Sequence, residues 1–216
     1  MWHLGMNSNM NFPAPLAAMG FLAACAGVLL SVCALLGAAF VGKRKIAQLT
    51  LSLAGCGALA YFGLLLVFSL ASHDRLLSVG QEKYFCEIDC HLAYSVLDAR
   101  QEATGANNRY TLILKTRFDE TTISSRRPKD APLAPSPRTV ELLDASGRGY
   151  LPSAVAGTAL TTSLIPGASY TTELTFYVPS EAQDLKLLIT TTPEWPDRVV
   201  IGDENSWLHK KTYFAL

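Results

Sequence analysis

The stretch RYTLILKTRF, residues 109–118, sends its side chains alternately to two faces, with the two-residue period of a β-strand. One face of this strand would hold Tyr110, Leu112, Leu114 and Thr116, and the other would hold Thr111, Ile113 and Lys115. Residues 171–178, TTELTFYV, and 185–192, LKLLITTT, are similarly rich in apolar and β-branched side chains. We therefore predict a β-strand in each of these three places.

Turn signals separate the predicted strands. They are DASGRG at 144–149, IPGAS at 165–169 and VPSEAQ at 178–183. No window after residue 72 shows the long apolar stripe of an amphipathic helix. Short strands joined by regular turns predict a mainly β domain, an antiparallel β-sandwich, in residues 82–216.

Residues 140–153 and 164–189 hold a particular order of strands and turns. A strand is followed by an Asp-x-x-Gly turn with an aromatic residue after it, a Pro-Gly turn, and a strand that ends in Val-Pro. The residues at these places are Asp144, Gly147, Tyr150, Pro166, Gly167, Phe176, Val178 and Pro179. This order resembles the immunoglobulin-like domain of unknown function found in many bacterial lipoproteins and surface proteins. The resemblance implies an extracytoplasmic immunoglobulin-like sandwich of the interaction type, with no inherited active site.

Two uncharged segments precede this domain, at residues 16–41 and 51–71. A transmembrane α-helix needs about 20 apolar residues to cross a bilayer core, so each segment is long enough to span. Residues 1–73 contain no Asp or Glu, and their only Lys or Arg residues are Lys43, Arg44 and Lys45. We therefore predict a transmembrane helical hairpin in residues 16–71, with a loop at 42–50.

The cationic cluster between the spans predicts the orientation, because short loops rich in Lys and Arg stay in the cytoplasm. Both the tail 1–15 and everything after the second span then lie outside. This places the protein in the bacterial cytoplasmic membrane, N-out and C-out. A juxtamembrane linker at 72–81 would lead to an extracytoplasmic, periplasmic domain at 82–216, and the lipid bilayer is its first partner.

The stretch YFCEIDCHLAYS, residues 84–95, contains two cysteines four residues apart. If it is one continuous strand, Cys86 and Cys90 lie about 13 Å apart on the core face and cannot bond. If the chain turns at EID, the two cysteines can close a small disulfide loop, which an extracytoplasmic location favours. In both cases we expect the strand that follows to direct Leu92, Tyr94 and Val96 to the core, with His91 and Ser95 facing away.

A metal site is a third interpretation of this stretch. Cys86, Cys90, His91 and His209 are suitable ligand types for copper or zinc, but the site requires distant parts of the domain to meet. The spacing does not match the copper-binding subunit of haem–copper oxidases, whose His and Met positions are here Tyr94 and Leu97. The sequence leaves core thiols, a disulfide and a metal site open.

Residues 124–138, SSRRPKDAPLAPSPR, contain four prolines and no strand pattern, so we predict an exposed loop between two strands. Its basic residues are Arg126, Arg127, Lys129 and Arg138. Long loops in compact domains often have a function, and this one is a candidate interaction loop.

The charge pattern and the motifs constrain the function. From Asp74 onward, 15 basic residues against 18 acidic ones leave a net charge of −3, which gives no electrostatic basis for binding nucleic acid. No Gly-x-Ser-x-Gly, His-Glu-x-x-His or phosphate-loop motif is present, so the sequence gives no support for an enzyme. We expect a membrane-anchored interaction or structural module, without a cofactor, that binds a neighbouring envelope or membrane protein. The alternative is a metal-binding or thiol-redox protein that uses Cys86, Cys90 and His91.

Overall fold

The structure, a computed structural model, describes residues 7–86, 90–123, 127–192 and 195–216. These residues form two compact units, and each is described by itself. The helical unit combines residues 11–73 with 195–210, and the β unit combines 7–10 with 74–192 and 211–216. The structure groups residues 195–210 with the helices, whereas the sequence predicts them within the domain at 82–216.

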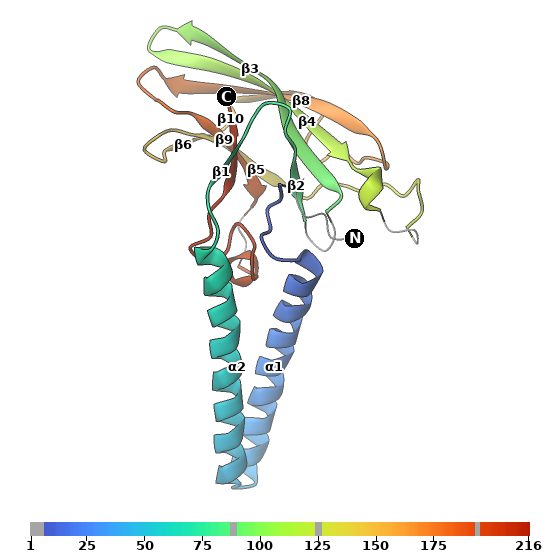
Figure 1. The fold of residues 1–216 in the computed structure, drawn as a ribbon, viewed down its shortest axis with the longest axis vertical. Helices are drawn as coiled ribbons and strands as arrows, with labels where there is room; N and C mark the ends of the chain where they lie inside the picture. The colour runs from blue at the N-terminus through green and yellow to red at the C-terminus, as the bar shows by residue number, and fades with distance from the viewer. Residues whose placement is uncertain (1–6, 87–89, 124–126, 193–194) are drawn as a thin grey trace. The chain divides into compact units, whose positions relative to one another are not determined.

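The helical unit contains two 27-residue helices, α1 (Ala14–Phe40) and α2 (Arg44–Leu70), packed side by side (Figure 1). Both helices are long and apolar enough to cross a membrane, and their most apolar windows are almost entirely unburied. Many large apolar side chains along both helices are exposed, as a transmembrane hairpin at 16–71 requires.

The connection between the two helices is shorter than the predicted loop at 42–50. Helix α2 begins at Arg44, so the chain reverses within residues 41–43. Gly42 allows this reversal because its φ of +67° lies in the left-handed region that favours glycine. Residues 44–50 contain no Pro or Gly and therefore extend α2, which keeps the cationic cluster at the tip of the hairpin.

The β unit contains ten strands in two five-stranded sheets within the described part of the chain. The first sheet has the order β2-β3-β4-β8-β7, with strands at Lys83–Phe85, Leu92–Thr104, Asn107–Phe118, Ser169–Pro179 and Ala154–Gly157. The second has the order β1-β10-β9-β5-β6, with strands at Arg75–Leu77, Thr212–Ala215, Lys186–Thr191, Arg138–Leu143 and Gly149–Tyr150. All pairs are antiparallel except β1 with β10. The predicted fold class, a mainly β sandwich preceded by two apolar helices, is confirmed.

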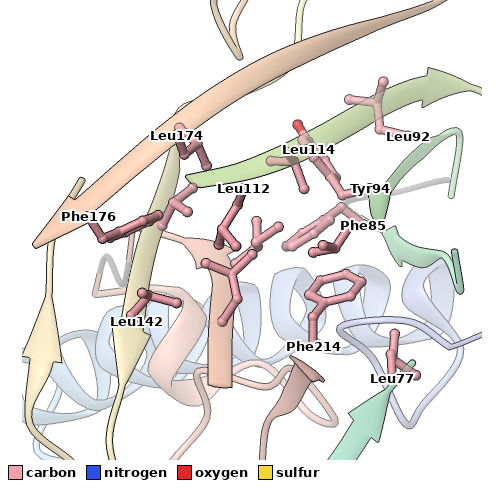
Figure 2. Close-up of a cluster of buried hydrophobic side chains, with 14 of the residues drawn as sticks. Leu77, Phe85, Leu92, Tyr94, Leu112, Leu114, Leu142, Leu174, Phe176 and Phe214 are labelled. Atoms are coloured by element: carbon pink, nitrogen blue, oxygen red, sulfur yellow. The ribbon is translucent and has the colours of Figure 1, made fainter. Parts of the chain in front are cut away.

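The core of the β unit lies between the inner faces of the two sheets (Figure 2). Every second residue is buried from Leu112 to Phe118 in β4 and from Thr172 to Val178 in β8, as the alternation in 109–118 and 171–178 predicts. From the second sheet, Leu142 and Phe214 point into the same cluster. Fully burying one such side chain stabilises the fold by about 1.5–3 kcal/mol, so this cluster dominates the stability of the unit.

Strand β3 follows the predicted alternation in part. Leu92, Tyr94 and Val96 belong to the core, which confirms their predicted direction. His91 and Ser95 were expected to face away from the core, and both are nevertheless buried. For His91 the reason is local, because its ring stacks on Phe118 at a centroid distance of 5.6 Å.

Candidate functional site

The two cysteines of the stretch 84–95 lie in a turn. Strand β2 ends at Phe85 and β3 begins at Leu92, and these two residues are antiparallel partners, so the chain reverses between them. Cys86 and Cys90 are joined as a disulfide, with sulfur atoms 2.02 Å apart and Cα atoms 4.1 Å apart. The stretch is therefore not one continuous strand, and of the three interpretations the structure contains the disulfide loop.

A thiol count tests this pairing. Of the five cysteines in the chain, Cys25, Cys33 and Cys56 are free thiols. We expect three reactive thiols in the denatured, unreduced protein and two more after reduction. A count of five before reduction, measured with a maleimide mass tag, would show that Cys86 and Cys90 are thiols.

A polar network lies on the outer face of the first sheet, beside the disulfide turn. In the strand register, Ala93 lies between Tyr84 on β2 and Arg117 on β4, so these three side chains share one face. Because Ala93 is small, the two longer side chains can meet above it and bury it. We name Glu82, Tyr84, Arg117 and Asp119 the Arg117 network.

Arg117 is the main donor of this network. Its Nε and one terminal nitrogen each donate to a carboxylate oxygen of Glu82 at 2.7 Å, a two-point geometry typical of strong Arg–carboxylate pairs. The same terminal nitrogen lies 2.8 Å from the Tyr84 hydroxyl and 3.0 Å from Asp119. The Tyr84 hydroxyl donates to Asp119 at 2.6 Å, so four side chains from two strands and two strand ends are tied together.

The network shifts the pKa values of its acids. The hydrogen bond from Arg117 lowers the pKa of Glu82. Burial acts to raise the pKa of Asp119, but hydrogen bonds from Tyr84, Thr121 and Arg117 outweigh it and hold that pKa well below its usual range. A carboxyl group with a lowered folded-state pKa stabilises the protein above its unfolded-state pKa, and this contribution is lost as the pH falls.

The stability of the β unit should therefore depend on pH through the Arg117 network. We expect the free energy of unfolding to fall between about pH 5 and pH 2, and to fall less steeply in Asp119→Asn. Urea unfolding of the detergent-solubilised chain, followed by near-ultraviolet circular dichroism, measures both profiles. Identical slopes for the two proteins would contradict the assignment of Asp119.

The network continues to His91 through the strand ends. The backbone N–H of Asp119 donates to the carbonyl oxygen of His91 at 2.8 Å. The Thr122 hydroxyl donates to the carbonyl oxygen of Asp119 at 2.8 Å and lies 2.7 Å from Nδ1 of His91. The Thr122 hydroxyl thus connects the Asp119 backbone to the His91 ring, and these contacts hold the imidazole in position.

A small pocket of about 40 Å³ lies where the disulfide stretch meets the proline-rich loop. Its lining residues are Phe85, His91, Leu92, Leu133, Ala134, Ser136 and Arg138. We name these residues the pocket site. The Arg138 guanidinium lies 4.3 Å from the centre of the Phe85 ring, and Arg127 lies 5.5 Å from that of Phe118.

The structure thus joins two regions that the sequence singled out separately. His91 from the first and Arg138 from the second line one pocket. Lys129 is exposed, and Arg126 lies outside the described residues. The pocket is far smaller than the 300–1,000 Å³ typical of small-molecule sites, so it suits the end of one side chain.

The four metal candidates are not brought together as a site in the described residues. Cys86 and Cys90 are bonded to each other, and His209 belongs to the helical unit whereas His91 belongs to the β unit. Across the described ranges, no group of three or more His, Cys, Asp and Glu side chains could hold a metal ion.

Lys83 is a residue that the sequence reasoning missed. Its side chain is 0% exposed, because the register places Lys83 opposite Tyr94 on the inner face of the first sheet. Its ammonium group donates to the carbonyl oxygens of Ile189 at 2.6 Å and Thr212 at 3.1 Å, both in the second sheet. The sequence could have indicated this, because Lys83 and the core residue Phe85 are two residues apart and therefore lie on the same face of a strand.

Comparisons with known proteins do not assign the chain to a family. No family model matches the chain, and no curated protein is similar to it. A solved structure that matches is an ApaG protein from Pseudomonas aeruginosa, at 16% identity, covering 45% of this chain and 91% of that one. Its TM-score is 0.26, and we base no argument on this similarity.

Proposed function

We propose that the chain is a membrane-anchored extracytoplasmic recognition module, and that its pocket site receives a side chain from a neighbouring envelope or membrane protein. The observation that supports this most is the meeting of the disulfide stretch and the proline-rich basic loop at one small pocket. We also propose that the β unit is related to the immunoglobulin-like domain of bacterial lipoproteins and surface proteins.

The composition of the pocket site supports protein recognition. Phe85, Leu92 and Leu133 give it an apolar surface, and Arg138 and His91 add polar groups at fixed positions. Binding energy at protein interfaces concentrates where a side chain enters a well-packed pocket, and Arg and aromatic residues are enriched there. The disulfide and the Arg117 network hold one side of the pocket in place before binding, which lowers the entropic cost of association.

The proposed location is the bacterial cytoplasmic membrane, N-out and C-out. The cationic cluster at the tip of the helical hairpin supports a cytoplasmic tip by the positive-inside rule. The disulfide in the β unit supports an oxidising compartment for that unit.

A metal-binding or thiol-redox protein is the second candidate function, because the disulfide lies next to His91. Zinc and copper bind to thiolates, and the bonded pair offers none until it is reduced. Elemental analysis of the reduced, purified chain separates the two functions. Stoichiometric zinc or copper that Cys86→Ser abolishes would favour the second.

Photo-crosslinking in native membranes tests the proposed function. A benzoylphenylalanine at Ala134, an exposed residue of the pocket site, should give one discrete adduct with another membrane or envelope protein. The control places it at Val155, which is exposed on the edge strand β7. Leu133→Lys should abolish the adduct at 134. Equal labelling at 134 and 155, or an adduct that survives Leu133→Lys, would contradict recognition at the pocket site.

A further inference from the structure

Helix α2 is longer than a bilayer core. Its 27 residues rise about 40 Å, whereas the hydrocarbon region is about 30 Å thick. With the cationic cluster at one membrane surface, the far end of the helix must reach the opposite surface and extend beyond it. A 30 Å core takes about 20 residues from Arg44, so the last turns of α2, from Leu64 to Leu70, pass through the opposite interface.

Residues 195–210 cover this far end of α2 within the helical unit (Figure 1). The Tyr61 hydroxyl donates to the carbonyl oxygen of Val199 at 2.7 Å. Leu65 is completely buried, in a cluster with Val199 and Ile201. The segment is thus fixed to the helix by a hydrogen bond and by apolar packing.

Contacts at two further points hold the segment in place. The backbone N–H of Asn11 donates to the carbonyl oxygen of Gly202 at 2.9 Å, and a Cβ at Gly202 would collide with Phe12. Near its end, the backbone N–H of Lys210 donates to the Ser72 hydroxyl at 2.8 Å. Ser72 lies two residues beyond the last residue of α2, so this contact also lies at the far end of the helix.

The segment also exposes large apolar side chains. Trp207 stacks on Phe62 of α2 at a centroid distance of 6.4 Å and is still 46% exposed. Leu208 is 67% exposed and has a φ of +65°, a conformation that a branched residue adopts only at a cost. Lys210 beside them is also exposed. An exposed Trp and Leu next to a Lys are unfavourable in water, but they match the residues enriched at membrane interfaces.

We propose that residues 195–210 form an interfacial element, with Trp207 and Leu208 inserted into the headgroup region of the leaflet that surrounds the far end of α2. The partner of these two side chains is lipid, because the segment packs on a membrane-spanning helix at the depth of the headgroups. Trp207 and Leu208 then fix the depth of the helix, while Lys210 reaches the phosphate layer. This inference is independent of the pocket site.

Depth-dependent fluorescence quenching tests the proposal on the full chain. Trp2 and Trp195 are replaced by Phe, so that Trp207 is the sole tryptophan, and the protein is reconstituted in phosphatidylcholine–phosphatidylglycerol vesicles. Lipids brominated near the headgroup should quench Trp207 more strongly than lipids brominated deep in the acyl chain. The emission should be blue-shifted, and aqueous iodide should quench it weakly.

A matched control calibrates the depth. The control variant carries Leu29→Trp, and its three native tryptophans, Trp2, Trp195 and Trp207, are replaced by Phe. Its sole tryptophan then lies near the middle of α1. This variant should show the reverse order, with the deeper bromines more effective. Strong iodide quenching of Trp207 with no effect of either brominated lipid would overturn the proposal. So would quenching of Trp207 with the same depth profile as position 29.

Discussion

Lys83→Met should lower the free energy of unfolding of the β unit by about 2–4 kcal/mol, although methionine has nearly the same shape as lysine. The Lys83 ammonium group donates to carbonyl oxygens of Ile189 and Thr212, and it links the two sheets from inside the core. Methionine fills the space but donates no hydrogen bond, so both carbonyl groups lose a charged donor in a buried place. Urea unfolding of the detergent-solubilised chain, followed by near-ultraviolet circular dichroism, measures the loss.

The control for this experiment is Lys129→Met, at an exposed lysine of the proline-rich loop. A surface substitution of this kind should change stability by no more than about 0.5 kcal/mol. If Lys83→Met were as harmless as Lys129→Met, the inward direction of Lys83, and with it the register of β2 on β3, would be wrong.

Phe176→Ala should cost about 3–5 kcal/mol, because it removes a fully buried ring from the centre of the core. The adjacent Tyr177→Ala should cost no more than about 1 kcal/mol, since Tyr177 lies on the other face of β8 and is half exposed. The same unfolding measurement compares the two variants. Equal losses would show that β8 does not present alternate residues to the core and to solvent.

Local patterns in the sequence were sufficient to predict the elements that bury one face. The alternation at 109–118 predicts which residues of β4 are buried, since a one-residue shift would expose Leu112 and Leu114. The two uncharged segments likewise predict both helices, because each is long and apolar enough to cross a membrane as a helix. That prediction did not include residues 44–50, the first seven residues of α2. They are polar enough for a loop, and they are helical because they continue the helix of the apolar segment.

The candidate site depended on contacts that are distant in sequence. The Arg117 network requires the register of β2, β3 and β4, which places Ala93 between Tyr84 and Arg117. The pocket site requires the loop before β5 to fold back onto the disulfide turn. No spacing within one stretch encodes either arrangement, so the sequence could name His91 and Arg138 as candidates but could not predict that they meet.

The proposed function depends most directly on the side of the membrane that the β unit occupies. The test uses a background in which the three free cysteines, Cys25, Cys33 and Cys56, are replaced by Ala. One variant then carries Ala103→Cys at the exposed β3–β4 hairpin, and a second carries Lys43→Cys at the tip of the helical hairpin. A membrane-impermeant maleimide is applied to intact spheroplasts and to permeabilised ones. We expect position 103 to be labelled in intact spheroplasts and position 43 only after permeabilisation. Labelling of position 43 in intact spheroplasts, with position 103 protected, would contradict an extracytoplasmic β unit and the recognition function proposed for it.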